Sequence, residues 1–516
     1  MSTASDGIAL TEALVSNVLN ARFEDIDAEI VDNAKRRILD MIGNAIAGSK
    51  SDGSPGLAET VAGWGGKKEA TVLGYGNKGP IADVAFINCI FGRSFDRGPL
   101  TYVIDGKRSP NHITETSALT ALATAESKKL SGRELITTMV VGDDLAGRLH
   151  VCVDRAQPGQ SLPPGPPPPP VTRGSEEAFA AAAIAGRILG LSGEQLRNAF
   201  GLATMLSGRG GAVVGTGPSS AARAPAAGGA GPSESRPGWQ GIKDPSFIAT
   251  MERASKEDSQ KDVSTKLSNG ISARNGVNAV QLAKAGWPGV RDPFFGQNGG
   301  HFPGVASVHH PDTISRDLGK KFIVEVCFKP YPGGRPTGAP TEAALLIARD
   351  NDLNVDDIDQ VILHLSPTAT AAHYATPYVI GEYPTMNALW SYYFAVASAL
   401  YRKSAAAENF TEIRIRDPRL QALIKKVKLG YLDKPEGIEL EVLMTNGQRF
   451  SQYVRTATGD PSNPLSRQGL IDKFIEQVEF SGLVSLKDGE RIIRLVEGLE
   501  EVTDVSLITR LAKKRD

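Results

Sequence analysis

The hydrophobic pattern of the chain changes near residue 320, and this change divides the sequence into two kinds of segment. Before it, apolar residues recur at helical spacing, and Ser-Gly-x-Glu/Gln sequences at Ser131 and Ser192 mark helix starts. This pattern predicts helices within residues 9–48 (two helices), 81–91, 116–125, 135–149, 176–189 and 195–206. Because strands and helices do not alternate here, the first half is expected to be a helical bundle.

After residue 320, strands and helices are mixed. We predict strands at 321–328, 358–365, 438–444 and 449–455 and helices at 340–349 and 387–401. Asn446-Gly447 between the last two strands is a hairpin signal. Helices return after Pro461. The predicted fold is mainly α with an α+β domain: a discontinuous helical domain (1–319, completed by 458–516) and an α+β domain (320–457).

Two inserts interrupt the helical half. Residues 162–170, LPPGPPPPP, are expected to form an extended polyproline stretch. Residues 207–241 are rich in Gly, Ala, Ser and Pro, and we interpret them as a loop with little to bury.

Charge and cysteine content favour a cytoplasmic protein and give no support for a nucleic-acid or membrane partner. The 516 residues include 57 basic and 58 acidic side chains without a long run of one sign, which gives no support for nucleic acid or a membrane as partner. No apolar run approaches the ~20 residues of a membrane span, and the N-terminal residues lack the pattern of a signal peptide. The three cysteines and seven histidines show no metal-binding spacing, and no nucleotide-binding motif occurs.

The stretch from Asn88 to Glu126 holds the first candidate site residues. Asp96 and His112 lie in a polar segment between two predicted helices, where a loop can direct functional side chains. The alternative interpretation is structural: Asp96 caps a helix and His112 is a hydrogen-bonded loop residue.

Basic residues provide the second group of candidates. Residues 328–335, FKPYPGGR, follow a predicted strand, and Lys329 and Arg335 on this turn could hold a carboxylate. A solvated basic turn is the alternative interpretation. Lys266 is a third basic candidate, although as a lone lysine it has no motif of its own.

Several segments together resemble the MmgE/PrpD family, which includes 2-methylcitrate dehydratase, cis-aconitate decarboxylase and iminodisuccinate epimerase. The resembling segments, in family order, are RRILDMIGNAIAGS, SGRELITTMVVGDDLAGRL, AAAIAGRILGLSGEQLRNAFGLA, FKPYPGGRPT and DPSNPLSRQGLIDKF. The resemblance implies a large helical domain with a smaller α+β lid, a homodimer, and action without a metal or an organic cofactor.

The resemblance also implies site residues. Asp96, His112, Lys266 and Lys329 match functional positions of the family, and Arg335 lies in the same turn as Lys329. Other positions depart from the family pattern, and these are Leu100 for a Thr, Val171 and Gly338 for His, and Phe394 for a Tyr, with Tyr393 beside it.

These matches imply a lyase of the dehydratase type, a carbon–oxygen lyase, acting on a small di- or tricarboxylic acid by removal of an α-proton. In this hypothesis Lys266, Lys329 and Arg335 bind carboxylates, Tyr393 stands in the substrate site, and His112 is the general acid/base with Asp96 orienting it or sharing the proton transfer. An epimerase, an isomerase or a decarboxylase on a similar substrate is the alternative. A catalytically idle relative that acts as a binding protein is a further alternative.

Overall fold

A computed structural model describes residues 4–100, 102–104, 107–109, 111–152, 175–207, 265–296, 299–302, 312–367 and 369–514. The inserts at 162–170 and 208–241 and the position of Val171 lie outside the described residues.

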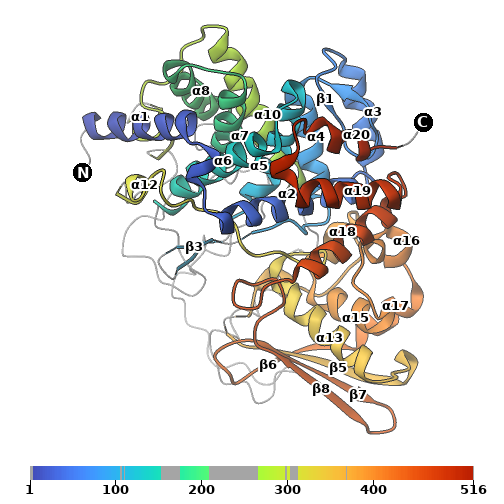
Figure 1. Cartoon of the computed structure of the whole chain (residues 1–516). Coiled ribbons are helices and arrows are strands. Elements are labelled where there is room, and N and C mark those ends of the chain that lie inside the picture. The colour runs from blue at the N-terminus through green and yellow to red at the C-terminus, as the bar shows by residue number, and fades with distance from the viewer. Residues whose placement is uncertain are drawn as a thin grey trace.

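The N-terminal half is a body of packed helices, as the sequence predicts (Figure 1). Its helices are α1 Ala4–Asn20, α2 Ala28–Gly48, α3 Ser54–Trp64, α4 Ile81–Arg93, α5 Ile113–Lys128, α6 Gly132–Val151, α7 Ser175–Ile188, α8 Gly193–Leu206, α10 Thr265–Lys284 and α12 Asp312–Ser315. Two short antiparallel pairs join them, β1 Ala70–Thr71 with β2 Lys78–Gly79 and β3 Tyr102–Ile104 with β4 Lys107–Ser109. Helix α10 packs against α4, α7 and α8 and so lies inside the body.

The predicted helix caps are present. The Ser131 hydroxyl accepts a hydrogen bond from the N–H of Glu134, and Ser192 and Gln195 cap α8 reciprocally. Each cap satisfies backbone groups that the first turn of a helix leaves unpaired.

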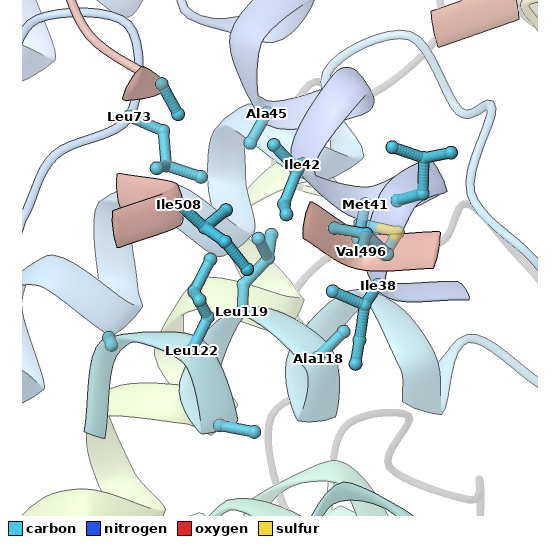
Figure 2. Close-up of a cluster of buried hydrophobic side chains, with 14 of the residues drawn as sticks. Ile38, Met41, Ile42, Ala45, Leu73, Ala118, Leu119, Leu122, Val496 and Ile508 are labelled. Carbon is cyan, nitrogen blue, oxygen red and sulfur yellow. The ribbon is translucent and has the colours of Figure 1, made fainter. Parts of the chain in front are cut away.

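The C-terminal helices return to the helical body. They are α18 Arg467–Ser481, α19 Leu486–Glu497 and α20 Ser506–Leu511. Figure 2 shows Val496 and Ile508 from these helices among apolar side chains of α2 and α5, such as Ile42 and Leu119. All four side chains are buried, and burial of one such side chain contributes about 1.5–3 kcal/mol. The last segment of the chain therefore completes the first core.

A second core forms around a four-stranded sheet with strand order β6-β5-β7-β8. Its strands are β5 Ile358–Leu365, β6 Val427–Tyr431, β7 Ile438–Met444 and β8 Arg449–Val454. Strand β5 pairs parallel to β6 and antiparallel to β7, and β7 and β8 form the predicted hairpin. The helices of this part are α13 Gly338–Asp350, α14 Pro384–Leu389, α15 Tyr392–Arg402, α16 Glu412–Ile415 and α17 Pro418–Lys426, of which α13, α15 and α17 pack on the sheet.

Two predicted elements differ from the structure. Residues 321–328 are not a strand: they cross the helical body, and Cys327 forms only an isolated bridge with Leu100. In this segment the Glu325 carboxylate instead accepts hydrogen bonds from the first backbone N–H groups of α5. The predicted helix 387–401 is broken between α14 and α15, because Ser391 adopts an extended conformation and caps α15.

No helix within the described part of the chain is both long and apolar enough to cross a membrane.

Candidate functional site

The turn after α4 places Asp96 in an uncommon backbone conformation. Its φ angle is 47°, in the left-handed region that Asp tolerates better than most residues. The Asp96 N–H donates to the carbonyl of Arg93 at 3.0 Å. The next residue is held from α18, because the Lys473 ammonium donates to the Arg97 carbonyl at 2.8 Å. The turn is therefore held by α4, which precedes it in the chain, and by α18, near the end of the chain.

Three side chains donate to the buried Asp96 carboxylate. Lys329 Nζ lies 2.6 Å from Oδ1, and the Arg93 guanidinium contacts the same oxygen. Trp390 Nε1 donates to Oδ2 at 2.8 Å. Burial alone would raise the pKa of Asp96, but Arg93 and Lys329 outweigh it and hold the pKa of this carboxyl well below its usual range. Asp96 is therefore an anion that holds two cations in place.

The FKPYPGG segment brings Lys329 and Trp390 to this turn. Its Gly333 N–H donates to the Phe95 carbonyl at 3.0 Å, and its Gly334 N–H donates to the Leu389 carbonyl at 3.2 Å. Glycine is required at both positions: Gly333 has a φ of 108°, and a Cβ at Gly334 would lie 1.7 Å from the Tyr374 hydroxyl. The segment thus joins the Asp96 turn to the break before α15.

His112 lies at the start of α5 and contacts two charged groups. Its Nδ1 is 3.0 Å from Glu115 Oε2, and its Nε2 is 3.4 Å from Nη2 of Arg93. Burial lowers the pKa of His112, Arg93 lowers it further, and Glu115 opposes both, with a net shift below the usual value. Burial would raise the pKa of Glu115, but Arg93 and His112 outweigh it and lower it. The pair is therefore a neutral imidazole beside a carboxylate at neutral pH.

A small pocket lies beside these groups, and in this arrangement it is too tight to hold a water molecule. Polar side chains from the helical body line one side of the pocket, namely Arg93, Ser94, Asp96 and Lys266. The other described lining residues come from α14 and the residue after it, namely Met386, Leu389 and Trp390. Burial lowers the pKa of Lys266 to about 8, with Asp52 opposing the shift and Arg93 adding to it. Because the pocket does not hold even a water molecule in this arrangement, a ligand can enter it only if its lining moves.

The structure brings together four of the six predicted site residues. Asp96, His112, Lys266 and Lys329 contact one another directly or through Arg93 and the shared pocket. Their catalytic roles stay predictions.

The other two predicted residues lie elsewhere. Arg335 donates to Asp460 Oδ2 at 2.7 Å and does not line the pocket. Tyr393 packs against the core around the sheet, where burial raises its pKa to about 12. Their participation in substrate binding stays a prediction.

Sequence reasoning missed three residues of the site, namely Arg93, Glu115 and Trp390. Glu115 follows His112 at i+3, so both lie on one face of the first turn of α5. The predicted helix began at Thr116, which hid this relation. Ser391 was a possible signal for Trp390, because a helix-capping serine predicts that the preceding residue lies outside the helix.

Asp96, His112 and Glu115 also form a group whose potential metal-ligand atoms lie within 4.8 Å of one another. The Arg93 guanidinium contacts all three side chains. A divalent cation there would face a permanent positive charge, so these residues do not fit a metal site.

Comparison with known families agrees with this arrangement. The N-terminal domain of the MmgE/PrpD family matches residues 12–233, and its C-terminal domain matches residues 331–501. The two matches cover most of the chain in the family's order. The chain belongs to the MmgE/PrpD family.

Two curated relatives match over nearly the whole length of the chain. Cis-aconitate decarboxylase of Homo sapiens is 24% identical over 530 residues, which is 98% of this chain and 95% of the relative. Cis-aconitate decarboxylase of Mus musculus is 24% identical over 527 residues, which is 98% of this chain and 93% of the relative. By name, both relatives are enzymes.

This MmgE/PrpD protein has buried apolar side chains at two of the positions that depart from the family pattern. Leu100 is 4% exposed and Phe394 is fully buried, with its ring 5.6 Å from that of Tyr378 and 5.2 Å from that of Phe410. Gly338 begins α13. The hydroxyl expected at 394 would therefore lie in the core and not in the pocket.

Proposed function

We propose that the protein is a cofactor-independent lyase that removes the α-proton of a small di- or tricarboxylic acid and eliminates water. One observation carries this proposal. Two cationic side chains, Arg93 and Lys266, line one small pocket; a third, Lys329, pairs with Asp96 of the same lining, and the neutral imidazole of His112 contacts Arg93. Cations bind carboxylates and stabilise the negative charge of an enolate, and a neutral imidazole accepts a proton.

The groups divide the work as follows. Lys266, which lines the pocket, binds one substrate carboxylate; a second carboxylate draws Arg93 away from His112, whose Nε2 then takes the α-proton. Arg93 and Lys329 supply positive charge where the enolate forms. As the β-hydroxyl leaves, the C–O bond breaks, a C=C bond forms, and Lys266 donates the proton that makes water; its pKa of about 8 suits this donation. Asp96 keeps Arg93 and Lys329 in position and, with its low pKa, transfers no proton.

A decarboxylase is the second candidate, because both curated relatives carry that name. In that reaction a C–C bond to a carboxylate breaks, carbon dioxide leaves, and the carbanion takes up a proton. An epimerase needs only removal and return of the α-proton. All three reactions use the same cationic side chains, so only the reaction products distinguish the dehydratase, the decarboxylase and the epimerase.

The test is proton exchange in D2O, followed by NMR, with a panel of small di- and tricarboxylates, including hydroxy acids and amino acids. A new alkene signal with α-proton exchange supports the dehydratase. Release of carbon dioxide replaces it with the decarboxylase, and loss of optical activity without a new compound replaces it with the epimerase. Silence across the panel from folded protein contradicts all three and supports the binding-protein alternative.

The variant that tests the base is His112→Ala, and we expect its turnover to fall by about 10²-fold or more. His364→Ala is the matched control. His364 lies on β5, with Nε2 3.6 Å from Glu441, and does not contact the pocket. Equal rates in the two variants would exclude His112 as the base.

A further inference from the structure

Glu115 is held on several sides in the first turn of α5. Its side chain is fully buried, with Oε2 at 3.0 Å from His112 Nδ1 and Oε1 at 3.4 Å from Arg93 Nη1. The backbone of Gly98 packs directly against it: a Cβ at Gly98 would lie 2.4 Å from Oε1 and 2.6 Å from Cγ. A glycine at 98 thus leaves the space that the glutamate fills.

The two neighbours of the His112 ring favour the same tautomer. The Glu115 carboxylate lies 3.0 Å from Nδ1 without hydrogen-bond geometry, and its negative charge favours the proton on this nitrogen. A guanidinium only donates, so Nε2 beside Arg93 must present its lone pair. The two contacts are independent, and they agree.

The backbone of His112 is fixed as well. Asn269 of α10 donates from Nδ2 to the His112 carbonyl at 3.0 Å. The N–H groups of Ile113 and Thr114 each donate to the Glu325 carboxylate at 3.1 Å. The ring orientation therefore depends on the side-chain contacts with Glu115 and Arg93 on a backbone that cannot shift easily.

We propose that Glu115 is a positioning residue that holds His112 in the Nδ1–H tautomer, so that its Nε2 becomes the proton-accepting atom of the site once a substrate carboxylate draws Arg93 away from it. The consequence for the reaction rests on the proposed function. When Nε2 takes the substrate proton, the Glu115 carboxylate stabilises the imidazolium that forms. His112 thus begins the reaction as a base, which is the order that α-proton removal needs.

Several charges face His112 and must be counted when its titration is interpreted. Arg93 at the end of α4 disfavours the imidazolium, while Glu115 on its own helix and Asp96 on the turn favour it. Lys329 reaches this group through Asp96, and the Glu325 carboxylate lies at the adjoining helix start. Removal of Glu115 alone shifts the balance toward neutral imidazole.

The tautomer is measured directly by ¹⁵N NMR of the histidine side chains in the full-length protein, with His112→Ala to assign the signal. We expect Nδ1–H in the unaltered protein. In Glu115→Gln the negative charge beside Nδ1 is lost, so the titration of His112 moves to lower pH, while Arg93 still disfavours a proton on Nε2. Nε2–H in the unaltered protein, or an unchanged titration in Glu115→Gln, overturns the proposal.

A second variant separates the position of the carboxylate from its charge. Gly98→Ala keeps Glu115 but forces its carboxylate to move, so we expect the same shift of the His112 titration. The matched controls are Glu126→Gln, because Glu126 is buried at the far end of α5 and pairs with Lys78, and Gly56→Ala, whose Cβ meets nothing within 4 Å. Neither control should alter the His112 signals, and a change in them equal to that of Gly98→Ala overturns the proposal.

Activity gives a separate result. On a substrate identified by the panel, Glu115→Gln should lower kcat at least tenfold and leave KM within threefold. An equal loss in Glu126→Gln would assign both effects to stability and overturn the positioning role. The expected spectra with no turnover on any carboxylate would contradict the proposed function while supporting the position of His112.

Discussion

The hydrogen bond from Trp390 to Asp96 allows a quantitative test of how the site is held. Among the described residues, Trp390 is the side chain that donates to Oδ2, whereas Oδ1 receives both cations. Trp390→Phe removes this donor but retains an aromatic ring, so little space opens for water. Because the Asp96 side chain is only 7% exposed, the charged oxygen is left without that partner. A hydrogen bond to a charged group contributes about 1.5–3 kcal/mol, and we expect the free energy of unfolding to fall by that amount.

The assay is urea-induced unfolding followed by circular dichroism, with the slopes of the variants required to agree. Trp287→Phe is the control: Trp287 is 62% exposed, and its replacement should change stability by less than about 0.5 kcal/mol. In an Asp96→Asn background, where the acceptor is neutral, the cost of Trp390→Phe should shrink to about 0.5–1.5 kcal/mol. A cost equal to that of the control, or one unchanged by Asp96→Asn, would refute the assigned hydrogen bond.

Four further predictions concern the pocket and the packing around it. Activity should fall as pH rises through about 8, because the Lys266 ammonium is then lost, and Lys266→Arg should lower kcat at all pH values, since a guanidinium binds a carboxylate but does not give up a proton. Activity should also fall at acid pH as His112 gains a proton, at a pKa below its usual value. Phe394→Tyr should lower the free energy of unfolding by about 1–3 kcal/mol in urea titrations, because its hydroxyl would be buried in the core; an increase in turnover would contradict this placement. Gly334→Ala should destabilise the protein by about 1–3 kcal/mol, since its Cβ would overlap Tyr374; a melting temperature unchanged from the parent would show that the turn is less closely packed.

Local signals in the sequence predicted much of the fold. Ser192 caps α8, and Asn446-Gly447 turns the β7–β8 hairpin, because each signal acts within a few residues. Residues 321–328 have a strand-like composition, yet the chain places them across helices, where Leu100 is their bridge partner. Strand formation depends on a neighbouring edge, which local composition does not encode.

Site residues that match the family pattern could be predicted from the sequence. Contacts between residues far apart in the chain could not. Lys329 and Asp96 are 233 positions apart, so their ion pair follows from packing alone. Trp390 could not be inferred from helical periodicity, because it reaches Asp96 only through the break before α15. Arg93 likewise resembled an ordinary last-turn arginine, which commonly interacts with the helix end.

The pocket depends on both parts of the protein, and this has a consequence for substrate entry. Arg93, Asp96 and Lys266 come from the helical body, whereas Met386 and Trp390 come from the part that contains the sheet. A carboxylate that pairs with Lys266 must enter a pocket too tight for a water molecule, in which Trp390 already contacts Asp96. We therefore expect the lining to open at this contact when a substrate enters, and a bound substrate to stabilise the closed lining only if it adds interactions on both sides. Trp390→Phe removes this contact and should weaken the closed arrangement in the absence of substrate. We expect the free-energy change calculated from kcat/KM to exceed the change in the free energy of unfolding.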